Sequence, residues 1–390
     1  MNEHEATKKL AFRFIILLGI VSLFGDITYE GARSITGPYL ATLGASASVV
    51  GLVAGIGEFT GYALRLASGY FVDRTGAYWV FTFLGYGLLV FVPLLAFAGY
   101  WQLAAIFIIL ERMGKAIRSP ARDTMLSYAA SEVGRGWGFG IHEALDQVGA
   151  IIGPLVFSLV FLLHGGYREG FTILWLPALL TLAILAVARH KVPSPQGLEV
   201  IAEGEEEKVT GKLPRVFWLY SLFTFFSVAG FANLQLISYH LKVQSVISDV
   251  QIPIYYAIAM GVDALVALII GKTYDKVGLI SLLAAPLLAL PIPLLAFSSD
   301  PTSVLVGFVL WGMVMGIQET VMRAAIADLI PVGRRGFAYG IFNTIYGASW
   351  FLGSFLMGSL YDISVNYIFF FTVAMELISV PILLLVRRAT

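Results

Sequence analysis

The octapeptide GYFVDRTG, residues 69–76, returns in altered form as GKTYDKVG at residues 271–278. Both copies have the pattern GxxxDxxG, and the offset from Gly69 to Gly271 is 202 residues. GRGWGFG at residues 134–140 and RRGFAYG at residues 334–340 form a second pair, with an offset of 200 residues from Gly140 to Gly340. Two pairs with nearly the same offset predict that the chain is an internal duplication.

The composition around these repeats is that of a polytopic membrane protein. Of the 390 residues, 58% are hydrophobic and only 13% are charged, whereas a soluble protein carries about 25% charged residues. Apolar runs long enough to cross a bilayer recur about twelve times. We therefore predict an all-α fold of twelve transmembrane helices in two pseudo-symmetric six-helix bundles, centred near residues 25, 60, 87, 115, 150, 179, 227, 262, 288, 316, 349 and 377.

The polar, acidic segment 191–214, KVPSPQGLEVIAEGEEEKVTGKLP, is the exception among short loops. It predicts a cytoplasmic linker between bundles at residues 9–190 and 215–388. If the N-terminus is cytoplasmic, lysine and arginine gather at the inner helix ends, and the outer loops hold little beyond Arg168 and Lys242. This asymmetry predicts that both termini are cytoplasmic and that the protein spans the cell membrane (inner or plasma membrane).

Several classes of function find no support in the chain. The net charge is zero and there is no cysteine, which gives no basic surface for nucleic acid and excludes thiolate chemistry. No GxxxxGK[ST], GxSxG or HExxH pattern is present, so neither ATP hydrolysis nor an enzyme is expected. We expect a monomer without a cofactor or metal, driven by an ion gradient, with the lipid bilayer and a small-molecule substrate as its partners.

The duplicated octapeptide resembles the signature of the major facilitator superfamily. The loop between that family's second and third helices has the form Gly-xxx-Asp-(Arg/Lys)-x-Gly, although its second basic residue is replaced here by Ala77. The resemblance implies that the loop gates the cytoplasmic side, where glycines allow a tight turn and close helix contact. The matching residues are Gly69, Asp73, Arg74 and Gly76, and in the second copy Gly271, Asp275 and Gly278.

The fifth predicted helix resembles the antiporter branches of the same family, which include drug exporters. Gly140, Gly149, Gly153 and Pro154 fit the spacing G-x8-G-x3-G-P, but the branch's final glycines are absent. Small residues at these positions predict close packing against a neighbouring helix. Ordinary small-residue packing is the alternative interpretation, and the resemblance favours antiport and an outward direction.

The first predicted helix carries Asp26, Glu30 and Arg33, spaced by four and three residues. Such positions share one helix face, and a charge deep in the membrane is costly unless it is paired or hydrated. In the resembled fold this helix lines the central cavity, which would bring the three charges to water and substrate. We interpret Asp26 as a proton-exchanging residue. Glu30 could serve the same role or form a static pair with Arg33.

Other polar residues lie along the predicted helices. The predicted helix centred near residue 115 has basic residues on one face, for which snorkelling to lipid head groups is the alternative. His142 and Asp146, one turn apart, could relay protons or form a hydrogen-bonded helix contact, and Glu376 we interpret as structural. The remaining substrate or coupling candidates are Glu58, Glu111, Arg112, Arg118, Arg122, Asn233, Gln235, Asp263 and Glu319.

Together these features predict a proton-coupled secondary transporter that moves a small amphiphilic organic solute by alternating access, with antiport export preferred. A proton-coupled symporter for an organic anion is the alternative, favoured by Arg33, Arg112, Arg118 and Arg122. An intramembrane enzyme, a channel and a lipid scramblase are further alternatives, and sodium remains a second candidate for the coupling ion.

Overall fold

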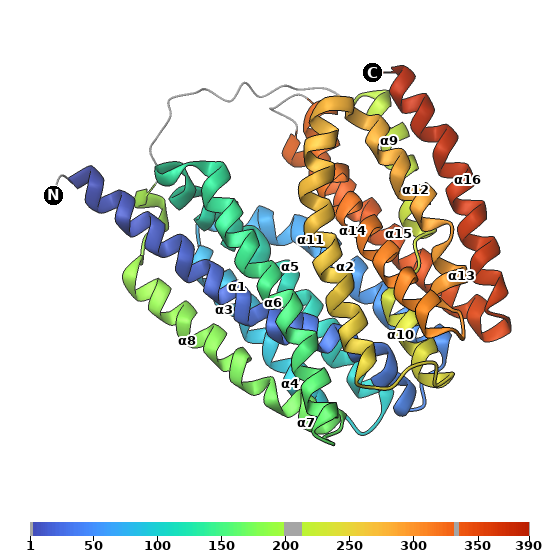
Figure 1. Ribbon diagram of the computed structural model, residues 1–390. Helices are drawn as coiled ribbons and strands as arrows, with labels where there is room; N and C mark the ends of the chain where they lie inside the picture. Colours follow the sequence, from blue (N-terminus) through green and yellow to red (C-terminus); the bar gives the residue numbers. More distant parts are fainter. Residues whose placement is uncertain (1–2, 199–212, 331–334, 390) are drawn as a thin grey trace. The chain divides into compact units, whose positions relative to one another are not determined.

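The computed structural model describes residues 3–198, 213–330 and 335–389 (Figure 1). The elements of these residues are helices, with no strand among them, as predicted. Residues 199–212 of the predicted linker and Arg334 of the second repeat pair lie outside the described residues.

The chain divides into two compact units. We call residues 1–33 and 64–204 the N-unit, and residues 34–63 and 205–390 the C-unit. The boundaries cut through helices α1 (Glu3–Thr42) and α2 (Ala47–Thr75). Residues 34–42 of α1 and 47–63 of α2 therefore pack with the second half of the sequence. The bundle limits expected from the sequence, 9–190 and 215–388, follow the two halves of the sequence. They do not include the packing of these parts of α1 and α2 with the second half.

The N-unit contains the beginning of α1, the end of α2 and the helices that follow. These are α3 (Tyr78–Gly87), η1 (Leu88–Val90), α4 (Phe91–Leu94), η2 (Leu95–Phe97), α5 (Trp101–Val133), α6 (Arg135–Leu162), α7 (Tyr167–Ile173), α8 (Trp175–Lys191) and η3 (Pro195–Leu198). The aromatic and aliphatic side chains of Phe14, Trp79, Met125 and Leu185 belong to its buried core. Phe14 and Trp79 meet edge to face with ring centroids 5.9 Å apart, a favoured aromatic geometry.

The C-unit contains α9 (Arg215–Ala229), α10 (Leu234–Val243), α11 (Gln251–Val277), η4 (Gly278–Leu283), α12 (Ala284–Ala289), α13 (Ile292–Ala296), α14 (Pro301–Leu329), α15 (Arg335–Ile363) and α16 (Asn366–Ala389). Helix α11 packs along α14, and α9 packs against α15 and α16 (Figure 1). One feature was not predicted. Residues 230–233 interrupt the predicted transmembrane helix centred near residue 227, which the structure forms as α9 and α10.

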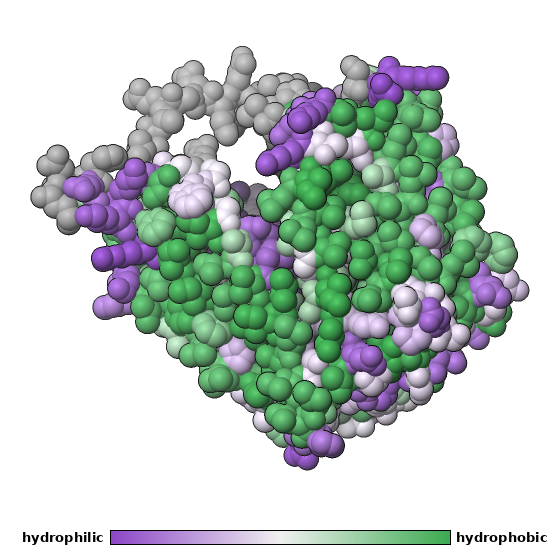
Figure 2. Space-filling model, viewed as in Figure 1, coloured by the Kyte–Doolittle hydropathy of each residue, from purple (hydrophilic) through white to green (hydrophobic). Residues whose placement is uncertain are grey.

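In the described part of the chain, nine helical segments are long and apolar enough to cross a membrane. All twelve predicted centres fall within helices, while the count of twelve spans stays a prediction. Helix α5 is not among the nine segments, and its middle part concentrates Glu111, Arg112, Lys115 and Arg118. Figure 2 shows largely hydrophobic faces over α6 and α11, where Leu159 and Leu268 are exposed. Such faces suit contact with lipid.

The two copies of the octapeptide have equivalent structural roles. Gly76 and Gly278 both have φ +64°, a left-handed conformation that favours glycine, and they follow the ends of α2 and α11. The first glycines also correspond, since a Cβ on Gly69 would lie 3.7 Å from Pro120 of α5 and a Cβ on Gly271 would lie 3.7 Å from Thr320 of α14. The structure therefore supports the predicted internal duplication.

Candidate functional site

A cluster of charged residues runs through the N-unit where α1, α5 and α6 meet. The face of α5 that carries residues 111, 115, 118 and 122 supplies most of the basic side chains, because residues three or four apart lie on one side of a helix. Five acidic residues balance five basic ones if all are ionised, which makes the burial of this cluster tolerable. They are Asp26, Glu30, Glu111, Asp123 and Asp146, and Arg33, Arg112, Lys115, Arg118 and Arg122.

The buried ring of Tyr29 on α1 is surrounded by cations. Lys115 Nζ lies 4.2 Å from the ring centroid, and the guanidinium carbons of Arg112 and Arg33 lie at 4.5 and 5.9 Å. Arg118 stacks in the same way on Tyr86, at 4.7 Å. Cation–π contacts of this kind strengthen when water is excluded. The arrangement holds basic side chains inside the unit rather than at lipid head groups.

The hydroxyl of Ser22 on α1 joins three helices, and the sequence analysis did not single it out. It lies 2.9 Å from Nε2 of His142 on α6 and 3.2 Å from the hydroxyl of Tyr86 on α3. Arg122 of α5 donates a hydrogen bond to it at 3.1 Å. His142 is thus linked to Arg122 through Ser22, one turn of α1 away from Asp26. Serine is too common in membrane helices for sequence alone to have identified it.

Asp26 is the residue at which the charges of α1, α5 and α6 converge. It interacts electrostatically with Asp146, Lys115, Glu30 and Arg118. Asp26 is packed closely on α6, because a Cβ on Gly149 would lie 3.1 Å from the Asp26 Cβ. One oxygen of Asp146, Oδ1, is buried and has no hydrogen-bond partner among the described residues. The structure therefore brings together two carboxylates that are 120 residues apart in the sequence.

Ion pairs account for most of the other charges in this cluster. Glu30 and Arg33 approach to 3.5 Å, which is the local pair considered for them. Glu111 and Arg118 are 3.9 Å apart, and Arg122 pairs with the half-exposed Asp123 at 2.8 Å. Arg122 thus has both Asp123 and Ser22 as partners, so it is fixed within the protein.

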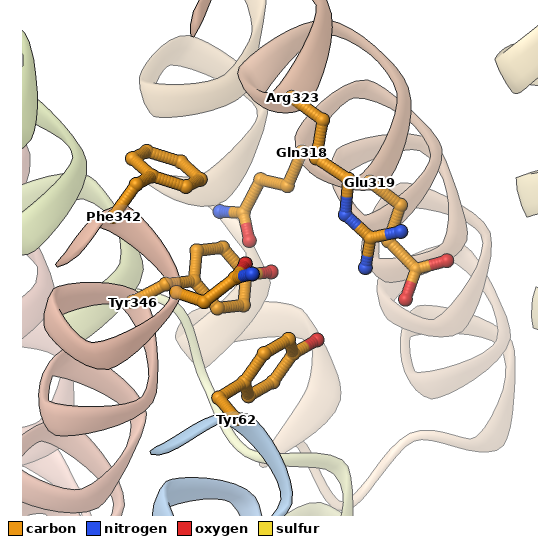
Figure 3. A pocket seen from close by; sticks show the side chains of 7 residues that line it. Tyr62, Gln318, Glu319, Arg323, Phe342 and Tyr346 are labelled. Carbon is orange, nitrogen blue, oxygen red and sulfur yellow. The ribbon is translucent and has the colours of Figure 1, made fainter. Parts of the chain in front are cut away.

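The C-unit contains a small pocket, with about 10 Å³ open to a water-sized molecule, lined by α2, α14 and α15 (Figure 3). Its lining residues are Tyr62, Gln318, Glu319, Arg323, Phe342, Asn343 and Tyr346. The rings of Tyr62 and Tyr346 meet edge to face at 4.9 Å, and Phe342 follows Tyr346 at 6.1 Å. The pocket thus presents an aromatic wall to the polar side chains of α14.

Gln318 is the most unusual residue of this pocket. It is 1% exposed, yet neither its Nε2 nor its Oε1 atom has a hydrogen-bond partner among the described residues. Figure 3 shows its amide turned toward the aromatic side chains of the pocket. A buried amide without partners is costly, and such a group is commonly found where a ligand or water completes the site. Gln318 and Tyr62 were not predicted, whereas Glu319 was.

Glu319 and Arg323 supply the charges of the pocket. Arg323 interacts electrostatically with Glu319 and hydrogen-bonds the hydroxyl of Tyr62, while its side chain remains exposed. Glu319 is only half-buried. Two opposite charges beside an aromatic wall can contact both the polar and the apolar end of one small molecule.

The remaining predicted residues lie elsewhere. Asn233 caps α10 by accepting from the N–H groups of Gln235 and Leu236, and it donates to Ser354 at 2.8 Å. Glu58 of α2 and Asp263 of α11 are buried in the C-unit, and Asp263 lies against Gly316 of α14. Asp73, Arg74 and Asp275 are exposed, and Arg74 donates to Tyr70 at 3.1 Å.

The predicted glycine motif of α6 separates into two parts. Gly149 and Gly153 contact α1, where a Cβ on Gly153 would come 2.7 Å from the Gly31 nitrogen. Pro154 lies inside the continuous helix α6. Gly140 instead has nothing within 4 Å of its Cβ position. Close packing therefore involves only the second half of the motif.

A helical membrane fold with an internal duplication, polar residues buried in each half and a repeated GxxxDxxG turn defines a secondary transporter. A family model of the Major Facilitator Superfamily matches residues 16–354 and 254–390, and the chain belongs to this family.

Two of the relatives match nearly the whole chain, and a third matches part of it. An uncharacterized protein of Mycobacterium tuberculosis (strain H37Rv) is 43% identical over 382 residues, covering 97% of this chain and 93% of its own. An uncharacterized MFS-type transporter of Methanocaldococcus jannaschii is 29% identical over 99% of this chain and 96% of its own. The multidrug resistance protein MdtG of Proteus mirabilis is 27% identical over 158 residues, 39% of each chain.

Solved transporter structures share the fold. A POT family transporter in complex with 5-aminolevulinic acid has a TM-score of 0.78 at 14% identity, covering 97% of both chains. A bacterial homologue of the human lysosomal transporter Spinster has a TM-score of 0.75 at 15% identity, again covering 97% of both chains.

Proposed function

We propose that this transporter exports a small amphiphilic organic solute in exchange for protons. The observation that carries the proposal is the convergence of Asp26 and Asp146 within the charged cluster of the N-unit. Two neighbouring carboxylates repel each other, and one positive charge between them relieves that repulsion. A proton and the cationic end of a solute can compete for the same place, which is the basic requirement of antiport.

The hydrogen bonds around Ser22 suit a proton pathway. His142 can accept or donate through either ring nitrogen, and its Nε2 atom lies 2.9 Å from Ser22. Asp146 is one turn further along α6 from His142. His142 on α6 therefore lies between the Tyr86–Ser22–Arg122 hydrogen bonds and Asp146, one turn along the same helix. Arg122 and Arg118 add positive charge to this region, which makes it polar.

The aromatic pocket of the C-unit supports an amphiphilic substrate. The space in it that is open to a water-sized molecule is only about 10 Å³, roughly that of a single water, so the pocket encloses no drug-sized ligand in this conformation. We infer that its lining contacts one moiety of the solute once the pocket widens, with an apolar ring against Tyr346 and polar atoms on Gln318. The multidrug resistance protein among the relatives favours export over uptake.

Alternating access would follow the usual scheme of the family, in which two bundles rock about a central binding region. The exposed Asp73 and Arg74, together with the tight turn at Gly76, suit a contact that forms in one state and breaks in the other. We propose this gating role for the first octapeptide and for its counterpart at Asp275.

Purified protein reconstituted into liposomes tests the proposal directly. A lipophilic organic cation is loaded on one side, and a trapped pH-sensitive dye follows protons while the cation moves down its gradient. Antiport acidifies the compartment that the cation leaves. Cation movement without any proton movement would refute proton coupling.

Symport of an organic anion is the second candidate, favoured by the exposed guanidinium of Arg323 and by the cations around Tyr29. In the same liposomes, an organic anion moving by symport would acidify the compartment that it enters.

A thermal-shift panel of lipophilic cations, organic anions, sugars and divalent metals, at two pH values, selects the solute for this assay, because a ligand of the folded state raises its apparent stability. Stabilisation by anions that is lost in Arg112→Ala would favour symport.

A further inference from the structure

The interruption between α9 and α10 creates a polar site whose residues belong neither to the pocket nor to the charged cluster. Helix α9 ends at Ala229 and α10 begins at Leu234, within one segment that is long and apolar enough to span a membrane. Two freed carbonyls find partners on neighbouring helices, since Thr372 of α16 donates to Gly230 O at 2.9 Å and Trp311 of α14 donates to Ala232 O at 2.8 Å. The interruption is therefore a stable part of the fold.

Glu376 of α16 lies directly against this interruption. It is 1% exposed, and its Oε1 atom would be 3.1 Å from a Cβ on Gly230. The carboxyl thus occupies space that only a glycine leaves free. Ser379 donates to its Oε2 atom at 3.1 Å, whereas Oε1 has no hydrogen-bond partner among the described residues.

Hydroxyl groups complete the surroundings of Glu376. Ser227 of α9 is within hydrogen-bonding reach of the carboxyl. By strict hydrogen-bond geometry, the buried Ser227 hydroxyl has no partner among the described residues. The site therefore offers Oε1 of Glu376 and the Ser227 hydroxyl as oxygen atoms that can coordinate.

No opposite charge is available to Glu376 in the described part of the C-unit. Desolvation, Ser379 and Ser227 are the influences on its carboxyl, without a contribution from any charged side chain. This holds for the titratable residues whose side chains the structure describes on α16 and on the helices packed against it. They are Tyr367, Arg387 and Arg388 on α16, Arg215 and Tyr220 on α9, and Tyr339, Tyr346, Tyr361 and Asp362 on α15. An ionised carboxylate this deep in a membrane protein requires a positive partner.

We propose that Glu376, Ser227 and the α9–α10 interruption form a binding site for a small monovalent cation, either a proton or Na⁺. Carboxylate, hydroxyl and carbonyl oxygens are hard ligands suited to such a cation. A single carboxylate offers too little charge to hold a divalent ion, and a membrane helix interrupted beside it is a common architecture for cation sites in transporters. This assignment replaces the interpretation of Glu376 as purely structural.

Thermal unfolding of the purified full-length protein tests for Na⁺. NaCl replaces choline chloride at constant ionic strength and at neutral pH, with wild type, Glu376→Gln and Ser227→Ala compared. If Na⁺ is the ligand, wild type is stabilised by NaCl, Glu376→Gln shows no NaCl effect, and Ser227→Ala needs about tenfold more NaCl for half the effect, as expected for the loss of one ligand. Glu143→Gln, an exposed glutamate of α6, controls for general charge effects and keeps the wild-type response.

Infrared spectroscopy over a pH series tests for the proton. If a proton is the ligand, NaCl has no specific effect, and wild type shows a carboxylic-acid C=O band that disappears at alkaline pH and is missing from Glu376→Gln but not from Glu143→Gln. A protein with neither a specific NaCl effect nor a Glu376-dependent band that titrates would overturn the proposal. Both measurements detect binding in the isolated protein, so their result is independent of the transport assay.

Discussion

The carboxylate of Asp362, in the last turn of α15, accepts a hydrogen bond at 3.1 Å from the backbone N–H of Ala47 at the start of α2. Its second oxygen accepts from the next N–H, that of Ser48, at 3.0 Å. The first N–H groups of a helix lack partners in their own helix and carry partial positive charge. An aspartate that lies 315 residues further along the chain thus caps α2 and fixes it to the C-unit.

Loss of this cap should loosen the start of α2. Capping side chains contribute about 0.5–2 kcal/mol. In Asp362→Ala, the population of molecules in which the start of α2 has locally detached should therefore rise roughly twofold to thirtyfold. Because the chain has no cysteine, Ala45→Cys, at a position buried in the α1–α2 connection, can report opening through its labelling rate with a membrane-impermeant maleimide.

Asp300→Ala is the matched control for that measurement. Asp300 caps its own helix α14 by accepting from the N–H of Ser303 at 2.8 Å, so its removal should leave the labelling of Ala45→Cys unchanged. Equal rates in Asp362→Ala and in the unmodified background would contradict a holding role for Asp362.

Asp26→Asn should abolish proton movement coupled to the solute while the protein stays folded. The amide keeps the size of the carboxylate but cannot bind and release a proton, so downhill solute movement should no longer change the trapped dye signal. Glu143→Gln serves as the control, because this exposed side chain of α6 lies outside the paired carboxylates. Full proton coupling in Asp26→Asn would rule out its assigned role.

Gln318→Met should separate stability from binding. Since both polar atoms of Gln318 are buried without partners in the described part of the chain, an apolar side chain of similar length should stabilise the unliganded protein by up to about 1–3 kcal/mol. The same change should weaken solute binding, measured as a smaller ligand-induced thermal shift. Ile317→Met, on the same helix and also buried, is the control and should neither stabilise the unliganded protein nor reduce the ligand-induced thermal shift. Unaltered solute binding in Gln318→Met would exclude the amide from the site.

Gly153→Ala should destabilise the N-unit, whereas Gly140→Ala should not. The added Cβ at position 153 meets backbone atoms of Ile27 and Gly31 on α1 at 2.6 and 2.7 Å, and overpacking of this kind costs about 1–3 kcal/mol. At position 140 no atom lies within 4 Å. Thermal unfolding of the two variants side by side decides the matter, since equal unfolding temperatures would show that the α1–α6 contact tolerates a side chain.

Ser22→Ala should destabilise the protein by about 1–3 kcal/mol, because it removes a shared partner of three buried polar side chains. Ser131→Ala is a suitable comparison, since the Ser131 hydroxyl bonds only to the carbonyl of Tyr128 one turn before it in the same helix. Chemical denaturation of both variants provides the measurement. A Ser22→Ala protein as stable as Ser131→Ala would mean that water replaces the hydroxyl at no cost.

Part of the candidate site could be predicted from the sequence. Charges in apolar helices are visible at once, and the column Asp26, Glu30, Arg33 and the basic face of α5 follow from helical spacing alone. Glu319 was identified in the same way. Ser22 and Gln318 were not identified, because an uncharged polar side chain carries no signal until its partners, or their absence, are seen.

The interruption of α9–α10 had a local signal that the sequence analysis passed over. Gly230 and Asn233 are typical of a helix end and a helix N-cap respectively, and Asn233 does cap α10. The hydrophobicity of residues 215–243 concealed the interruption, since apolar composition indicates a span without showing whether its helix is continuous.

The sequence by itself determined the class of protein, the helical architecture and the duplication, because hydropathy, helical spacing and a repeated turn motif are local properties of the chain. Only the tertiary structure decided which polar groups meet. Asp26 with Asp146, Asp362 with the start of α2, and Glu376 with Gly230 are each separated by more than a hundred residues. Such pairs depend on how helices pack, and many arrangements of packed helices satisfy the same hydrophobic pattern.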